Sequence, residues 1–269
     1  MKATGWILTG ALVSVCGSAY GDAYGVKPNN PQLPGVPYVV HDGTRPQPPV
    51  ITTGGAVVVK APSDAKVLFD GSSLDAWTSG GGPAKWVIKD GSLVASPPGN
   101  LRTKESFGAV QLHLEWRLPA DREVDDQNGG NSGVFLMGLY EIQVLQSHKN
   151  KTYPDGQATA LYGQLPPLVN ATAPQGEWQS YDIAFEPPVY EGEKVVRPAK
   201  VTVMHNGVIT QHGESFLGPT QYQKLAAYPP THPLTAPIEL QFHGDPIEYR
   251  NMWVRPLGER DKGPAEPQK

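Results

Sequence analysis

The sequence is poor in cysteine, in charge and in long apolar runs. Its 269 residues include one cysteine, Cys16, and only 18% of them are charged. The main apolar run, Trp6 to Val15, is too short to span a bilayer comfortably. The net charge of -4 gives no electropositive footprint for nucleic acid. We therefore expect neither a nucleic-acid partner nor a membrane span.

Motifs for nucleotide cofactors and for the common hydrolytic sites are also absent. The sequence contains no Walker loop, no dinucleotide fingerprint, no His-Glu-x-x-His and no Gly-x-Ser-x-Gly elbow. These absences argue against a nucleotide-dependent enzyme, a zinc protease and an α/β-hydrolase. No cofactor is predicted with certainty.

Glycine and proline are abundant, with 30 and 28 residues. Together they make up roughly a fifth of the chain, against about 12% in an average protein. Glycine disfavours helix interiors through entropy, and proline through its missing N–H and its ring. A helical bundle is therefore excluded, and a mostly β protein with one sizeable core is expected.

The first residues have the layout of an export signal. Lys2 precedes the apolar run, and the small residues Ser18, Ala19 and Gly21 follow it. This order predicts a signal peptide at residues 1–21 and a periplasmic or secreted protein. Lipid attachment at Cys16 is the weaker alternative, because the preceding residue is valine where a small residue is expected.

Composition divides the rest of the chain into three parts. Residues 22–65 are rich in proline and are predicted to form either a tether or an arm on the domain surface. The folded domain is expected at residues 66–257. A polar C-terminal tail follows at residues 258–269.

Apolar residues of the folded part recur with period two, which is typical of strands. Asp90-Gly91 and Asn206-Gly207 are hairpin turn signals. The predicted strands include Trp86–Lys89, Ser92–Val94, Val110–Leu118, Ser132–Met137, Tyr140–Gln146, Trp178–Phe185, Ala199–His205, Ile238–Phe242 and Tyr249–Arg255. Many short strands and no long amphipathic helix predict an all-β, two-sheet antiparallel sandwich or jelly roll.

Two of these strands carry polar residues along one face. Glu141 and Gln143 alternate with apolar neighbours, and so do Glu239, Gln241 and His243. Such a face either binds a polar ligand such as a sugar or is the solvated outer face that any antiparallel sheet has.

The folded part also contains a series of short motifs in a fixed order. They are Val67-Leu-Phe-Asp-Gly-Ser-Ser-Leu-Asp-Ala-Trp77, Gly130-Asn-Ser-Gly-Val-Phe135, Tyr140-Glu-Ile-Gln143, Ala160-Leu-Tyr-Gly163, Gly176-Glu-Trp178, His205-Asn-Gly207, Leu240-Gln-Phe-His-Gly-Asp245 and Glu248-Tyr-Arg-Asn251. In this order they resemble one family, the 3-keto-disaccharide hydrolase domain, over roughly Lys66 to Leu257. The resemblance implies a concanavalin A-like jelly roll of the lectin and glucanase type, and an enzyme that cleaves the glycosidic bond of 3-keto-disaccharides.

The implied substrate suggests an elimination. A ketone at C3 makes the C2 proton acidic and places the anomeric leaving group β to the carbonyl, so a base can start cleavage. We assign proton transfer to Glu141 and His243 and substrate binding to Gln143 and Gln241. If a divalent ion is used, Glu141 and His243 become ligands, with Asp155 or His148. A partner sugar dehydrogenase would supply the 3-keto substrate.

Further substrate-binding candidates are Asn131, Tyr162 and Arg250. Each has a structural alternative: a turn for Asn131, the core for Tyr162 and a carboxylate partner for Arg250. For Glu141 the structural alternative is a pair with Arg250. Two other functions stay open, a non-catalytic lectin-like module and a structural protein of the cell envelope, because a fold does not fix a function.

Overall fold

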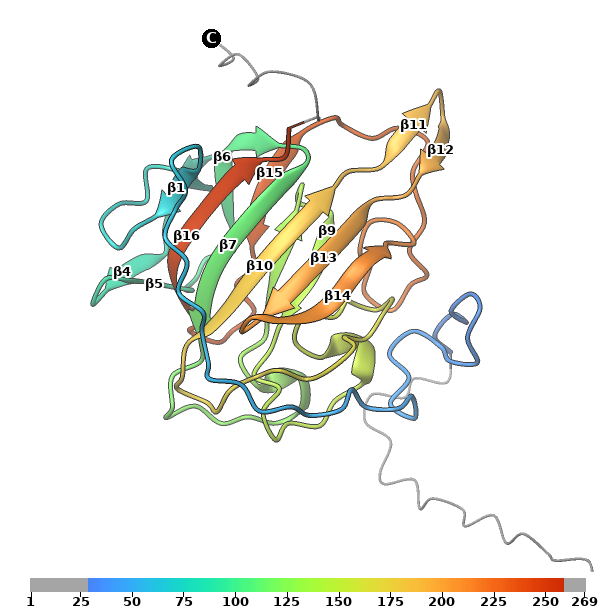
Figure 1. The fold of residues 1–269 in the computed structure, drawn as a ribbon, viewed down its shortest axis with the longest axis horizontal. Helices are drawn as coiled ribbons and strands as arrows, with labels where there is room; N and C mark the ends of the chain where they lie inside the picture. Colours follow the sequence, from blue (N-terminus) through green and yellow to red (C-terminus); the bar gives the residue numbers. More distant parts are fainter. Residues whose placement is uncertain (1–28, 259–269) are drawn as a thin grey trace, which may run out of the picture.

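The computed structural model describes residues 29–258, which form a sandwich of two antiparallel sheets (Figure 1). The larger sheet has eight strands, in the order β14 (Val208–Ser215), β13 (Lys200–His205), β10 (Gln179–Glu186), β7 (Val110–Arg117), β16 (Glu248–Pro256), β5 (Ser92–Val94) and β4 (Val87–Lys89), with β1 (Lys66–Phe69) also paired to β16. The smaller sheet has six strands, in the order β3 (Gly82–Pro83), β2 (Trp77–Ser79), β6 (Leu101–Phe107), β15 (Ala236–Leu240), β8 (Ser132–Leu136) and β9 (Tyr140–Val144).

The predicted all-β, two-sheet antiparallel jelly-roll sandwich is confirmed. A separate hairpin, β11 (Val189–Glu191) and β12 (Lys194–Arg197), extends from one end. Within residues 29–258 the helical structure consists of two short 3-10 turns, η1 (Asp126–Asn128) and η2 (Pro154–Gly156). No helix in this part of the chain is long and apolar enough to cross a membrane.

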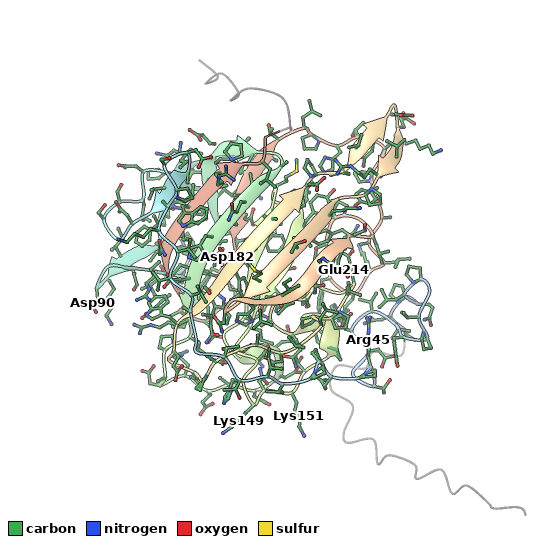
Figure 2. All side chains as sticks on the ribbon, viewed as in Figure 1. Arg45, Asp90, Lys149, Lys151, Asp182 and Glu214 are labelled. Atoms are coloured by element: carbon green, nitrogen blue, oxygen red, sulfur yellow. The ribbon has the colours of Figure 1, made fainter. Side chains whose placement is uncertain are left out.

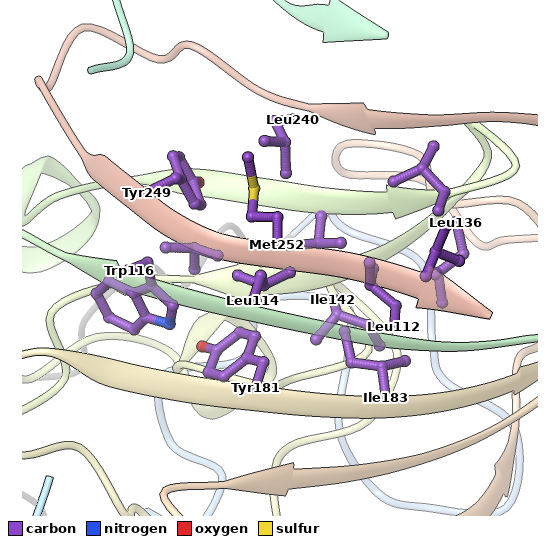
Figure 3. Close-up of a cluster of buried hydrophobic side chains, with 14 of the residues drawn as sticks. Leu112, Leu114, Trp116, Leu136, Ile142, Tyr181, Ile183, Leu240, Tyr249 and Met252 are labelled. Atoms are coloured by element: carbon purple, nitrogen blue, oxygen red, sulfur yellow. The ribbon is translucent and has the colours of Figure 1, made fainter. Parts of the chain in front are cut away.

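The core lies between the two sheets (Figure 3). Strand β7 contributes Leu112, Leu114 and Trp116, which alternate along one face as the sequence predicts. Ile142 from β9 and Leu240 from β15 pack from the smaller sheet. Burying these apolar faces fixes which way the alternate polar residues of β9 and β15 point, namely away from the core.

The proline-rich arm lies against the domain, as the blue segment of Figure 1 shows. The N–H of Ile51 donates to the carbonyl of Asn170 at 3.0 Å, and that of Val57 donates to Ser180 Oγ at 2.9 Å. Trp253 Nε1 donates to the carbonyl of Val59 at 3.0 Å. The arm thus covers part of the outer face of the larger sheet.

This cover explains a buried polar cluster on that face. His113 lies opposite the core-facing residues of β7, yet it is fully buried. Its Nδ1 is 2.8 Å from Oδ1 of Asp182, whose position on the sheet is labelled in Figure 2. The acidic partners outweigh burial and raise the pKa of His113. The predicted signal peptide at residues 1–21, with Cys16, and all but the first residue of the predicted tail at 258–269 lie outside the described residues.

Candidate active site

A cavity of about 440 Å³ opens on the outer face of the smaller sheet. Its wall is formed by β8, β9, the segment after β15 and loops that include both 3-10 turns. The volume lies within the range of small-molecule sites. The cavity wall, among the described residues, contains carboxyl, imidazole, amide and tyrosine groups but no lysine or arginine.

Glu141 lies in the wall because β9 alternates. Ile142 and Val144 enter the core, so Glu141 points outward into the cavity. Its N–H donates to Thr220 Oγ1 at 3.0 Å. On the neighbouring strand, a Cβ at Gly133 would lie 2.5 Å from Glu141 Oε1 and 2.8 Å from the ring of Phe135. The glycine therefore makes room for the carboxyl group.

The carboxyl group of Glu141 lies in a buried environment that disfavours its ionised form. The residue is only 5% exposed, and no described basic side chain forms an ion pair with it. Burial, and to a smaller extent the negative charge of Glu239, raises the pKa of Glu141 to about 8. A carboxyl group with such a pKa is suited to proton transfer near neutral pH.

Gln143 lies behind this wall and does not line the cavity. With its amide nitrogen turned toward the carboxyl group, Gln143 donates to Glu141 Oε1 at 3.2 Å and to the carbonyl of Ser132 at 3.1 Å. This orientation satisfies the amide better than the reverse one, which directs the nitrogen to Asn131 and Gln127. The structure therefore makes Gln143 a support for Glu141, whereas the sequence predicted direct substrate binding.

Gln241 and His243 come to the same cavity from the end of β15. The chain remains attached to β8 there, because the N–H of Gln241 donates to the carbonyl of Gly133 at 3.0 Å and Ser132 Oγ donates to the carbonyl of Gln241 at 2.6 Å. Glu141 of one predicted polar face and Gln241 and His243 of the other thus meet at one cavity, whereas Glu239 pairs with Arg102 outside it.

Asn131 and Tyr162 also line the cavity. The hydroxyl of Tyr162 is 2.7 Å from that of Tyr153, another residue of the wall. Burial raises the pKa of both tyrosines, so they act at neutral pH as uncharged hydroxyl groups.

Arg250 is not brought to the cavity. It belongs to β16 of the larger sheet, where its Nε donates to Glu115 Oε2 at 2.7 Å. Its guanidinium carbon lies 4.0 Å from the centre of the Trp178 ring. The structure thus shows the structural alternative for Arg250, in which a carboxylate partner joins two strands. That partner is Glu115, not Glu141 as the sequence suggested.

The sequence analysis missed several residues of the wall. His41 reaches it from the proline-rich arm, Asp126 and Gln127 from η1, and Thr220 and Tyr222 from the loop after β14. None of them belongs to a strand, so period two gives no signal for them. Asp126 adds a second carboxyl group, and its Oδ1 is buried without a hydrogen-bond partner.

The divalent-ion alternative does not fit the arrangement. Within residues 29–258, no three His, Cys, Asp or Glu side chains are grouped so that they could hold a metal ion. Asp155 instead accepts the N–H of His41 at 2.9 Å. His148 does not line the cavity.

A polar cavity on the outer face of a β-sandwich, with a buried carboxyl group of raised pKa in its wall, is a candidate active site. Comparison with family models makes this specific: residues 64–255 match the 3-keto-alpha-glucoside-1,2-lyase-like domain. The chain belongs to this family and is a carbohydrate-active enzyme. The resemblance noted in the sequence is thereby confirmed.

Solved structures from Parabacteroides distasonis agree with the family. One, named a putative glycosyl hydrolase, is 40% identical over 79% of this chain and 93% of its own, with a TM-score of 0.72. A second of the same name is 24% identical over 72% of this chain and 99% of its own, with a TM-score of 0.53, and it supports the fold alone. No curated protein matched the chain.

Proposed function

We propose that this enzyme cleaves the glycosidic bond of 3-keto-glycosides by elimination followed by hydration. The observation that carries the proposal is Glu141, a buried carboxyl group without a cationic partner that opens into the cavity. A carboxylate with a pKa of about 8 is a much stronger base than an ordinary one, which suits removal of a weakly acidic C–H proton.

In the proposed reaction, Glu141 takes the proton from C2, and the electrons of the C–H bond pass into an enolate whose oxygen is at C3. The carbonyl re-forms, a C1–C2 double bond is made, and the C1–O bond to the aglycone breaks. His243 donates a proton to the departing oxygen. Water then adds its hydroxyl to C1 and a proton to C2, which yields the 3-keto monosaccharide.

The test compares a 3-keto-disaccharide with its unoxidised parent, with and without a chelator, and follows the released sugar. We expect cleavage of the oxidised sugar only, and no turnover by Glu141→Gln. Cleavage of both sugars at similar rates would contradict the elimination, because the parent has no acidic proton at C2. Loss of activity on chelation would contradict the metal-free elimination, because the described residues hold no group of three His, Cys, Asp or Glu side chains for an ion.

Asp126 supports a second candidate, ordinary glycoside hydrolysis by two carboxyl groups. Asp126→Asn separates the two reactions. Under elimination this variant should retain at least a tenth of the wild-type kcat/KM on the 3-keto-disaccharide. Under two-carboxylate hydrolysis, Asp126→Asn and Glu141→Gln should each abolish cleavage of the unoxidised sugar.

A further inference from the structure

The proline-rich arm contributes a side chain to the cavity wall. His41 lies more than 80 residues before any other residue of the wall, yet it is 2% exposed and lines the cavity. Neither of its ring nitrogens has a hydrogen-bond partner among the described residues. A buried imidazole without partners is costly, because such groups ordinarily form hydrogen bonds.

The chain holds His41 in place through its backbone. Upstream, Gln32 Nε2 donates to the carbonyls of Val36 and Tyr38, at 2.6 and 2.7 Å, and closes a turn that leads to His41. His41 itself has a φ of 57°, an uncommon conformation for a residue other than glycine. Its N–H is bound by Asp155 Oδ2 at 2.9 Å. Uncommon backbone conformations of this kind are often retained at functional sites.

The ring of His41 is enclosed by aromatic groups. Its centroid is 4.3 Å from that of Tyr153, 4.9 Å from that of Tyr162 and 5.6 Å from that of Tyr222. A Cβ at Gly163 would lie 3.2 Å from Cε1 of the ring, so the glycine of the Ala160-Leu-Tyr-Gly163 motif leaves room for it. Nδ1 is 3.7 Å from Asp155 Oδ1, and we therefore assign Nε2, not Nδ1, to a ligand.

We propose that the arm is part of the active site and that His41 donates a hydrogen bond from Nε2 to the substrate sugar, at the ketone oxygen that becomes the enolate. This inference rests on the proposed function, because elimination places negative charge on that oxygen. A donor on a buried side chain stabilises such a charge more strongly than one in water.

Four proteins test the assignment: wild type, His41→Ala, His41→Gln and Val50→Ala. Val50 is a matched control, because it lies on the same arm with its side chain 70% exposed and away from the cavity. On a 3-keto-disaccharide, we expect His41→Ala to lower kcat by about 10²–10³-fold, as loss of one oxyanion donor does. His41→Gln, which keeps a donor, should recover part of the loss, and Val50→Ala should stay within twofold of wild type.

Failure of this inference and failure of the proposed function give different results. If wild type cleaves the sugar and His41→Ala cleaves it within threefold of wild type, His41 is not a donor to the reaction. If His41→Ala and His41→Gln lose activity equally and both unfold at a lower temperature, the role of His41 is structural. If wild type cleaves nothing, the proposed function fails. Binding of the same sugar then tests whether His41 contacts it: equal Kd values for wild type and His41→Ala would overturn the proposed contact.

Discussion

Glu141→Gln should make the protein more stable at neutral pH while it removes turnover. The pKa of Glu141 rises from an ordinary value of 4.5 to about 8 in the folded protein. Below pH 4.5 the group is neutral in both states and has no effect on the free energy of unfolding. Between pH 4.5 and 8 the unfolded chain ionises and the folded one does not, so the free energy of unfolding falls as the pH rises.

The size of the effect follows from this window. Each pH unit within it costs about 1.4 kcal/mol. At pH 7, roughly two and a half units above 4.5, the cost is about 3 kcal/mol. Glutamine has nearly the same shape and no charge, so it removes this cost. For a domain of this size that corresponds to a rise of about 6–12 °C in Tm.

Thermal and urea unfolding of wild type, Glu141→Gln and Glu193→Gln at pH 4 and pH 7 would measure this. Glu193 is exposed in the β11–β12 turn and serves as the control. Glu141→Gln should be more stable than wild type at pH 7 and within about 1 kcal/mol of it at pH 4. Equal stability of the two proteins at pH 7 would refute the description of Glu141 as a buried carboxyl group held against its charge.

Three further outcomes are expected. The kcat/KM of wild type should rise with pH and level off near pH 8, because only the ionised form of Glu141 is a base; a plateau already present at pH 6 would contradict this. Gly133→Ala should lower kcat/KM at least tenfold, since its Cβ would displace the Glu141 carboxyl group; unchanged kinetics would show that the carboxyl can move without cost. Arg250→Ala should lower the free energy of unfolding by about 1–3 kcal/mol, because the buried carboxyl group of Glu115 loses the Arg250 guanidinium. Its kcat/KM should stay within threefold of wild type; a larger loss would show that Arg250 takes part in the active site.

Strand periodicity predicted the part of the site that lies on the sheet. Glu141 and His243 were found because their neighbours, Ile142 and Phe242, are apolar and pack toward the core. Periodicity shows that a strand has a polar face but not to which sheet the strand belongs. Arg250 follows a core residue, Tyr249, as Glu141 follows Tyr140, and only the pairing of β16 with β7 places it on the other sheet.

The rest of the site was beyond sequence reasoning because it depends on contacts between distant segments. His41 lies in a segment with no strand pattern, and it reaches the cavity through a hydrogen bond to Asp155, 114 residues further along the chain. Proline fixes local backbone angles but not the surface on which a segment lies. For the same reason the composition left the tether and the surface arm as equal alternatives.

The two unusual groups of the cavity are most simply explained together. Glu141 is a buried acid without a cation, and His41 is a buried imidazole without a hydrogen-bond partner, so each one lowers the stability of the protein that holds it. The rigid sandwich beneath them can bear this cost, because its core supplies far more stabilisation than either group removes. A base without a cationic partner and a ring without a hydrogen-bond partner are suited to a ligand that carries an acidic proton beside a carbonyl oxygen. A 3-keto sugar has this pair of groups, at C2 and C3, whereas the unoxidised sugar has neither.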